Sequence, residues 1–189
     1  MTRRWRGTID VPPTEDGLKD AMRLGGRLRL GVIYHDSLSR CRRTAVAMSP
    51  YSTVETDGPR PWKMGPLFEG HEITPESIIN SQWQVENPWI FPLGGEQFGR
   101  WLWDWKEWIS MVDMDRLLVR ERKGVVTHNR NIQALYSRHS DTFYPKLYNA
   151  VGPSPLTVHV YSKGHIAPWN GKDVPGLYLI RHAPTEWGT

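Results

Sequence analysis

The segment Leu177-Tyr178-Leu179-Ile180-Arg181-His182-Ala183-Pro184-Thr185-Glu186-Trp187 joins an apolar run directly to a cationic and an imidazole side chain. The apolar run predicts a short buried strand, and Pro184 predicts a turn after it. Ligands of α/β proteins bind beyond the carboxyl ends of parallel strands, which is where Arg181 and His182 would lie. Arginine binds anions, and a neutral histidine can act as a nucleophile or a base. An isolated Arg-His pair is more often structural than catalytic. Whether this pair is catalytic therefore depends on the side chains that follow the other predicted strands.

Two further predicted strands end in side chains of the same kind. The apolar run 30–34 is followed by a predicted helix with Arg40 in its first turn, and the run 124–127 ends at His128. Helix starts favour anions because their backbone N–H groups are unpaired. We therefore expect Arg40, His128, Arg181 and His182 to converge on one pocket, suited to a tetrahedral phosphoryl group.

Short apolar strands alternate with helices along the chain, which predicts an α/β domain with a largely parallel sheet. The expected helices cover 14–24, 37–47 (or 39–47), 75–83, 98–111 and 129–140, and the expected strands cover 30–34, 124–127, 156–161 and 177–180. Residues 50–95 are interpreted as an excursion over the active site, and the polar segment 162–176 as a linker to the last strand. We expect a single domain, 1–189.

Composition excludes several classes of protein. The 189 residues are 39% hydrophobic and 23% charged, which excludes a disordered chain. No apolar run is long enough to span a membrane, and no secretion signal is recognised, so we expect a cytoplasmic protein without membrane partners. A single cysteine, Cys41, and dispersed histidines give no metal-binding motif. Trp101, Trp105 and Trp108 share one helix face, which favours core packing over base stacking.

The net charge of +4 is compatible with a phosphorylated substrate, with weak nucleic-acid contact or with an ordinary solvated surface. Basic residues cluster only at 3–6 and 40–43. Nucleic acid is the less favoured partner, and a phosphorylated small molecule the favoured one.

Taken together, the motifs of the chain resemble those of the histidine phosphatase superfamily, the phosphoglycerate-mutase-like proteins. The matching segments are Trp5-Arg6-Gly7, Asp10-Val11-Pro12, Thr14-Glu15-Asp16-Gly17, Ser37-Leu38-Ser39-Arg40, Thr44-Ala45, Pro92-Leu93-Gly94-Gly95-Glu96, Val125-Val126-Thr127-His128 and Arg181-His182-Ala183-Pro184-Thr185. The resemblance covers almost the whole chain. It implies a three-layer sandwich in which helices flank a mostly parallel central sheet.

The resemblance also implies a reaction and roles for individual residues. A phosphomonoester would be hydrolysed through a phosphohistidine on His182, with Arg181, Arg40 and His128 holding the phosphoryl oxygens. His128 would also belong to the catalytic group. No metal and no cofactor would be needed, because the side chains supply the positive charge. The alternative is a non-catalytic module that keeps the fold and binds phosphate or nucleic acid.

The order of the motifs departs from the family, because the Arg-His strand comes last rather than first. We interpret the chain as a circular permutant opened in the loop that follows the Arg-His motif, with 162–176 as the new connection. The other interpretation is a mis-cut reading frame. Chain ends are commonly close together at the surface, so a permutant is physically reasonable.

The proton donor is a second departure. Pro61 stands where many relatives carry the acidic residue that protonates the leaving group. Glu69 is our substitute candidate, and an ordinary surface carboxylate is the alternative interpretation. Without a good acid, the enzyme would favour substrates whose leaving group is itself acidic. The sequence does not identify the substrate or the oligomeric state.

Overall fold

The computed structural model describes residues 3–118, 121–136 and 154–188. Six strands form one sheet, in the order β2-β1-β3-β6-β4-β5. Their bounds are Val32–His35 (β1), Ser52–Glu55 (β2), Lys123–Thr127 (β3), Val158–Ser162 (β4), His165–Pro168 (β5) and Leu177–Arg181 (β6). The pairs β2/β1, β1/β3 and β3/β6 are parallel, and β6/β4 and β4/β5 are antiparallel. The strand that ends in Arg181 therefore lies in the middle of the sheet.

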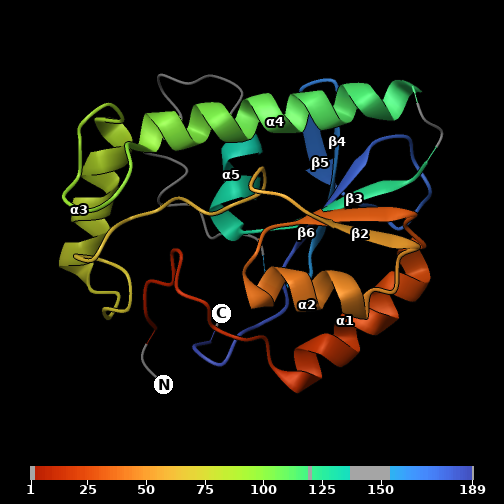
Figure 1. Cartoon of the computed structure of the whole chain (residues 1–189), viewed down its shortest axis with the longest axis horizontal. Helices are drawn as coiled ribbons and strands as arrows, with labels where there is room; N and C mark the ends of the chain where they lie inside the picture. Colours follow the sequence, from red (N-terminus) through yellow and green to blue (C-terminus); the bar gives the residue numbers. More distant parts are fainter. Residues whose placement is uncertain (1–2, 119–120, 137–153, 189) are drawn as a thin grey trace.

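Helices cover both faces of the sheet and make a three-layer sandwich (Figure 1). The helices are Glu15–Leu28 (α1), Ser39–Ala47 (α2), Pro75–Glu86 (α3), Phe98–Leu118 (α4) and Asn129–Tyr136 (α5). Helices α1 and α2 lie on one face, and α4 and α5 on the other. The observed architecture is the expected α/β fold.

Two hydrophobic clusters hold the layers together, and alternate residues of β6 enter each of them. Leu177 and Leu179 pack with α4 and α5, whereas Tyr178 and Ile180 pack with α1 and α2. This alternation is the period-2 pattern of a strand that is buried on both faces. Trp101 and Trp105 are almost fully buried in the α4 cluster, which confirms that the tryptophan stripe belongs to the core.

Local signals explain the helix ends. Thr14 caps α1, since its Oγ1 accepts from the N–H of Gly17 at 3.0 Å, and Glu15 and Asp16 follow in the first turn. A capping box between Thr74 and Ser77 starts α3. Gly25 lets α1 approach the end of α2, because a Cβ at this position would overlap the backbone of Met48.

Several sequence-based boundaries were wrong. The excursion 50–95 contains an edge strand, β2. The helix predicted at 75–83 within the excursion is α3, which runs to Glu86. The supposed linker 162–176 contains β5, which pairs with β4 and leaves only Ile166 buried, so its pattern was too polar to predict a strand. The α4 helix extends to Leu118 instead of 111. Residues 137–140 of the last expected helix lie outside the described part of the chain.

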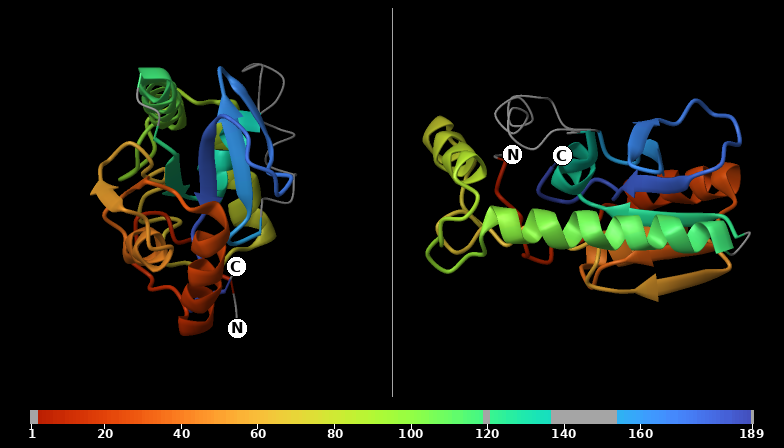
Figure 2. Two further views of the ribbon diagram at one scale, coloured as in Figure 1. Left: turned by 90° about the vertical axis from the view of Figure 1, so that its right-hand side faces the viewer. Right: turned by 90° about the horizontal axis from the view of Figure 1, so that it is seen from above.

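The excursion also carries α3 away from the sheet. In the right-hand view of Figure 2, α3 lies beyond the first turns of α4, at the opposite end of that helix from the strands. None of the helices in the described ranges combines the length and apolar character needed to cross a bilayer.

Candidate active site

The carboxyl ends of the adjacent parallel strands β1, β3 and β6 bring the expected residues together. Arg181 is the last residue of β6 and His182 follows it, while His128 follows β3. Arg40 lies in the first turn of α2, after β1. All four residues line one open pocket of about 520 Å³. The convergence predicted from three strand ends is thus present in the structure.

His182 is oriented by its own backbone neighbour. Its Nδ1 lies 2.7 Å from the carbonyl oxygen of Ala183, and a carbonyl can only accept, so Nδ1 carries the proton. Nε2 is then the unprotonated nitrogen in the neutral ring. Burial, helped by the charges of His128, Arg40 and Arg6, holds the pKa of His182 well below its usual value. His182 is therefore a neutral imidazole at neutral pH, as a nucleophile requires.

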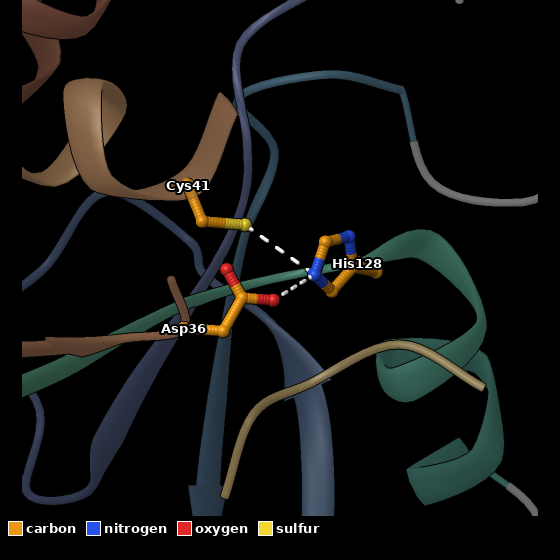
Figure 3. Close-up of side chains that lie close together, drawn as sticks. All are labelled: Asp36, Cys41 and His128. Atoms are coloured by element: carbon orange, nitrogen blue, oxygen red, sulfur yellow. Dashed lines mark hydrogen bonds and ion pairs between the residues drawn. The ribbon is translucent and has the colours of Figure 1, made fainter. Parts of the chain in front are cut away.

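His128 stands beside His182, with 5.4 Å between the ring centroids. Its Nε2 lies 2.5 Å from Oδ2 of Asp36, the residue that directly follows β1, and 3.5 Å from Sγ of Cys41 (Figure 3). The carboxylate accepts, so Nε2 of His128 is the donor. Burial and the neighbouring arginines Arg40 and Arg6 lower the pKa of His128, while Asp36 opposes them. Asp36 was not predicted as a site residue.

The carboxyl group of Asp36 is an anion despite being buried. Burial alone would raise its pKa, but His128, the N–H of Leu38 and the charge of Arg40 together hold the pKa below its usual value. Oδ1 of Asp36 accepts from the Leu38 N–H at 3.1 Å, which fixes the carboxyl plane at the start of α2. Asp36 thus supplies an acceptor of fixed orientation to His128.

Asp36, Cys41 and His128 also form a possible metal-ligand group, since their ligand atoms lie within 4.8 Å of one another. Two ligand atoms of a tetrahedral zinc ion are about 3.3 Å apart, given metal–ligand distances of about 2 Å. The 2.5 Å contact between Nε2 and Oδ2 is shorter and is a hydrogen bond. Burial raises the pKa of Cys41 well above its usual value, so its thiol keeps the proton that a metal would displace. The geometry fits a hydrogen-bonded trio better than a metal site.

Three guanidinium groups are crowded into the inner part of the pocket. Arg40 donates to the carbonyl oxygens of Ile9 and Gly7, at 2.6 Å each, and its buried Nε has no partner among the described residues. Arg6 was missed as a site residue, because it appeared only as one member of a basic cluster. Burial and the other arginines lower the pKa of Arg6 and of Arg181 to about 10. An anion in this pocket would be held by strong, charge-assisted hydrogen bonds.

The two segments that flank the pocket at opposite ends of the sequence run side by side (Figure 1). Nη1 of Arg6 donates to Oγ1 of Thr185 and to the carbonyl oxygen of Gly188, both at 2.8 Å. The N–H of Thr14 also donates to the carbonyl oxygen of Pro184. The loop after His182 is therefore held in place by the segment that precedes α1.

Glu69 lies behind the pocket wall rather than among the residues that line it. Its Oε1 accepts from the N–H and the Oγ1 of Thr8, and its Oε2 accepts from the N–H of Gly65 at 3.1 Å. The carboxyl group packs against Gly7, where φ is +48° and where a Cβ would overlap Oε1. Glu69 thus fixes the backbone of the wall. Pro61 itself lines the pocket, beside Trp62.

Glu96, from the Pro-x-Gly-Gly-Glu segment, holds the other wall. It accepts from Nη1 of Arg60 at 2.5 Å and from the N–H of Lys63 at 2.9 Å. Its carbonyl oxygen accepts from Nε1 of Trp62 at 3.0 Å. These contacts fix Trp62, which lines the pocket and lies against the guanidinium group of Arg130.

The family of the chain follows from its similarity to known proteins. A sequence model of the histidine phosphatase superfamily (branch 1) matches residues 1–165. No curated protein matches.

Solved structures share the fold at low sequence identity. The mycobacterial glucosyl-3-phosphoglycerate phosphatase, in complex with inorganic phosphate, has a TM-score of 0.62 at 17% identity, over 83% of each chain. The alpha-ribazole phosphatase of Shigella flexneri has a TM-score of 0.65 at 14% identity, over 88% of this chain and 87% of that chain. A phosphoglycerate mutase from Thermus thermophilus has a TM-score of 0.53 at 22% identity, over 71% of this chain and 73% of that chain. By its sequence match, and in keeping with its fold and its histidine–arginine pocket, this chain belongs to the histidine phosphatase superfamily, branch 1.

Proposed function

We propose that this protein is a phosphatase that hydrolyses a small phosphomonoester through a phosphohistidine on His182. The observation that carries the proposal is the pairing of a neutral, oriented His182 with Arg40, Arg181 and His128 in one pocket. A nucleophile among phosphate-binding cations suits phosphoryl transfer, which depends on positioning and on charge stabilisation. A module that only binds phosphate would have no use for the nucleophile.

The reaction follows in two displacements. Nε2 of His182 uses its lone pair to attack phosphorus, and the bond from phosphorus to the leaving oxygen breaks with its electron pair on that oxygen. Arg40, Arg181 and His128 stabilise the charge on the three equatorial oxygens. Water then attacks phosphorus, the P–N bond breaks with its electron pair on Nε2 of His182, and inorganic phosphate leaves with the two protons of the water molecule. The guanidinium groups supply the positive charge, so we propose that no metal ion takes part.

The leaving oxygen needs a proton unless it is a stable anion. Glu69 remains the candidate donor named from the sequence, but its two oxygens accept three hydrogen bonds and are suited to accepting rather than giving protons. We therefore propose that substrates with acidic leaving groups react fastest. A ratio of kcat/KM for phenyl phosphate to that for 4-nitrophenyl phosphate near unity would contradict this.

Hydrolysis of 4-nitrophenyl phosphate tests the function, because its leaving group needs no acid. Wild-type protein should release nitrophenol, also after treatment with a metal chelator, and His182→Ala should not. His165→Ala is the matched control, since His165 is exposed on β5 and away from the pocket. A folded wild-type protein without activity would overturn the phosphatase proposal and favour a phosphate- or nucleic-acid-binding module.

We also propose that the order of the motifs is a circular permutation of the family's usual one. The central strand β6 follows all the other strands along the chain, and the segments around Thr14 and Pro184 are joined by backbone hydrogen bonds. Moving residues 171–189 in front of Met1 would restore the family order and open the chain at the exposed Gly171. This rearranged protein should fold and keep the activity of the original towards 4-nitrophenyl phosphate. Folding of the rearranged protein but not of the original would argue for the mis-cut reading frame instead.

A further inference from the structure

Helix α4 is apolar on two faces over residues 109–118. Ile109 and Val112 are buried in the hydrophobic cluster that α4 shares with the sheet. The exposed apolar residues of the same stretch, which we call the outer patch, are Met111, Met114, Leu117 and Leu118. A helix that is apolar all round is normally buried all round. The outer patch is therefore the kind of helix face that a partner covers.

The outer patch lies along a helix on the outside of the molecule. In the right-hand view of Figure 2, α4 runs along the near side, and no other described helix or strand crosses it. Spacings of three residues from Met111 to Met114 and of four from Met114 to Leu118 place these side chains in one row. Single exposed apolar residues are common on soluble proteins, whereas contiguous patches mark interaction surfaces.

The outer patch is large enough for a dimer of this chain. The exposed fractions are 55% for Met111, 67% for Met114, 59% for Leu117 and 84% for Leu118. Together these residues expose on the order of 500 Å² in each copy, so two copies would bury about 1,000 Å², the size at which specific interfaces begin. Flexible methionine side chains also suit a face that adapts to a partner.

The pattern of the outer patch suits pairing with itself. Met111, Met114 and Leu118 follow the alternating three- and four-residue spacing of a helix–helix seam. When two such helices pair antiparallel about a two-fold axis, Met111 of each copy lies opposite Met114 of the other. The exposed Glu107, one turn before Met111, then lies near each end of the pair, opposite Leu118. A parallel pair would set Glu107 against itself, and like charges repel.

We propose that the outer patch is a dimer interface, in which α4 packs antiparallel against α4 of a second copy of this chain. The acidic residues beside the patch, Glu107 and Asp115, disfavour an anionic membrane or a nucleic acid as the occupant. None of the four residues of the outer patch is among the described residues that line the pocket of His182. The dimer is therefore independent of the proposed phosphatase function, and either proposal can fail without the other.

Sedimentation equilibrium of the full chain tests the dimer. The wild type should be dimeric at about 10 μM, and Met114→Glu should weaken the dimer at least about 100-fold, because both copies would bring a carboxylate into an apolar interface. Met22→Glu is the matched control and should leave the dimer unchanged, since Met22 is 60% exposed on α1. Met114→Leu keeps the apolar surface and should still dimerise. Far-UV circular dichroism checks that each variant is folded.

Three results would overturn the proposal. A wild type that stays monomeric at about 100 μM would show that the patch does not bind a second copy with the affinity expected of a specific interface. A dimer that survives unchanged in M114E would place the interface elsewhere. A monomeric wild type that floats with phosphatidylcholine vesicles, where M114E does not, would assign the patch to a lipid surface.

Cross-linking tests the antiparallel arrangement. Cys41, the single cysteine of the chain, is buried, so an introduced cysteine would be the accessible thiol of each variant. Mild oxidation of a mixture of Met111→Cys and Met114→Cys proteins should give more disulfide-linked dimer than oxidation of either protein alone, because the two positions lie opposite each other. More linked dimer in the single-variant samples would indicate a parallel pair and contradict the proposal.

Discussion

Oδ2 of Asp36 lies 2.5 Å from Nε2 of His128, and both side chains are buried. This contact fixes the ring of His128 and leaves Nδ1 as its other nitrogen. A bound phosphate dianion would offset the charges of Arg40 and Arg6, which are among the causes that lower the pKa of His128. We infer that Asp36 is a positioning residue, which stabilises the imidazolium form of His128 when substrate is bound.

Replacing Asp36 with Asn should therefore lower kcat by about 10- to 100-fold, on the scale of weakening one charge-stabilising donor. The amide keeps the shape and an oxygen for the Leu38 N–H but loses the charge. Since His128 would lose its protonated form at lower pH, the alkaline limb of the kcat profile should move to lower pH. The measurement is kcat against pH for 4-nitrophenyl phosphate. Asp115→Asn, at an exposed position of α4, is the control, and a pH profile unchanged in D36N would contradict the inferred role.

Arg6 should prove important because it joins two segments distant in the sequence. Arg6→Lys keeps the charge, but its Nζ lies one bond closer to Cα than the Nη1 that contacts Thr185 and Gly188 at 2.8 Å, so both contacts are weakened. We expect a loss of about 1–2 kcal/mol in the free energy of unfolding, typical of hydrogen bonds from a charged group. Misplacement of the loop after His182 should reduce kcat about tenfold or more. Urea titration and steady-state kinetics measure the two effects, and a variant that matches the wild type in both would show that these contacts are dispensable.

Stability should decrease as the pH falls below about 6.5, the usual pKa of histidine in an unfolded chain. In the folded protein, burial and nearby cations hold the pKa of His182 well below that value, and burial also lowers that of His159. Between the two pKa values the unfolded state binds a proton that the folded state does not, so acid favours unfolding. The urea midpoint should be constant above about pH 7 and fall towards about pH 5, and less steeply in His182→Gln. A midpoint that rises on acidification would show that the histidines are protonated in the folded state.

Trp101 and Trp103 offer a matched test of the core. Trp101 is fully buried, and its Nε1 donates to the carbonyl oxygen of Arg60, while Trp103 is 65% exposed on the same helix. Trp101→Ala should destabilise the fold by about 3–5 kcal/mol, and Trp103→Ala by less than about 1 kcal/mol. Thermal or urea unfolding of both variants measures the difference. Similar losses would mean that the face of α4 has been assigned wrongly.

The sequence could predict the residues whose chemistry is visible at a strand end. Apolar runs are directly followed by Arg181, His182 and His128. A parallel arrangement of those runs as strands was enough to predict that the three side chains lie close together. Asp36 could not be found in this way, because its role depends on the register of β1 beside β3. His35, its neighbour, had the more conspicuous side chain, yet its Nδ1 contacts the backbone oxygen of Asp36.

Long-range contacts explain the other misses. Arg6 gains its role only through Thr185 and Gly188, at the far end of the chain. Strand β5 is exposed except at Ile166, so no apolar alternation marked it. The capping box at Thr74 and Ser77 explains the start of α3, but its end at Glu86 lies beyond the predicted boundary.

The most direct test of the account is to trap the phosphoenzyme in a single turnover. Wild-type protein mixed in excess with a ³²P-labelled substrate and quenched in alkali should carry acid-labile, alkali-stable label on the peptide that contains His182. The label should appear before inorganic phosphate and be absent from His182→Ala. Release of phosphate without a labelled intermediate, or label that persists in the variant, would contradict nucleophilic catalysis by His182.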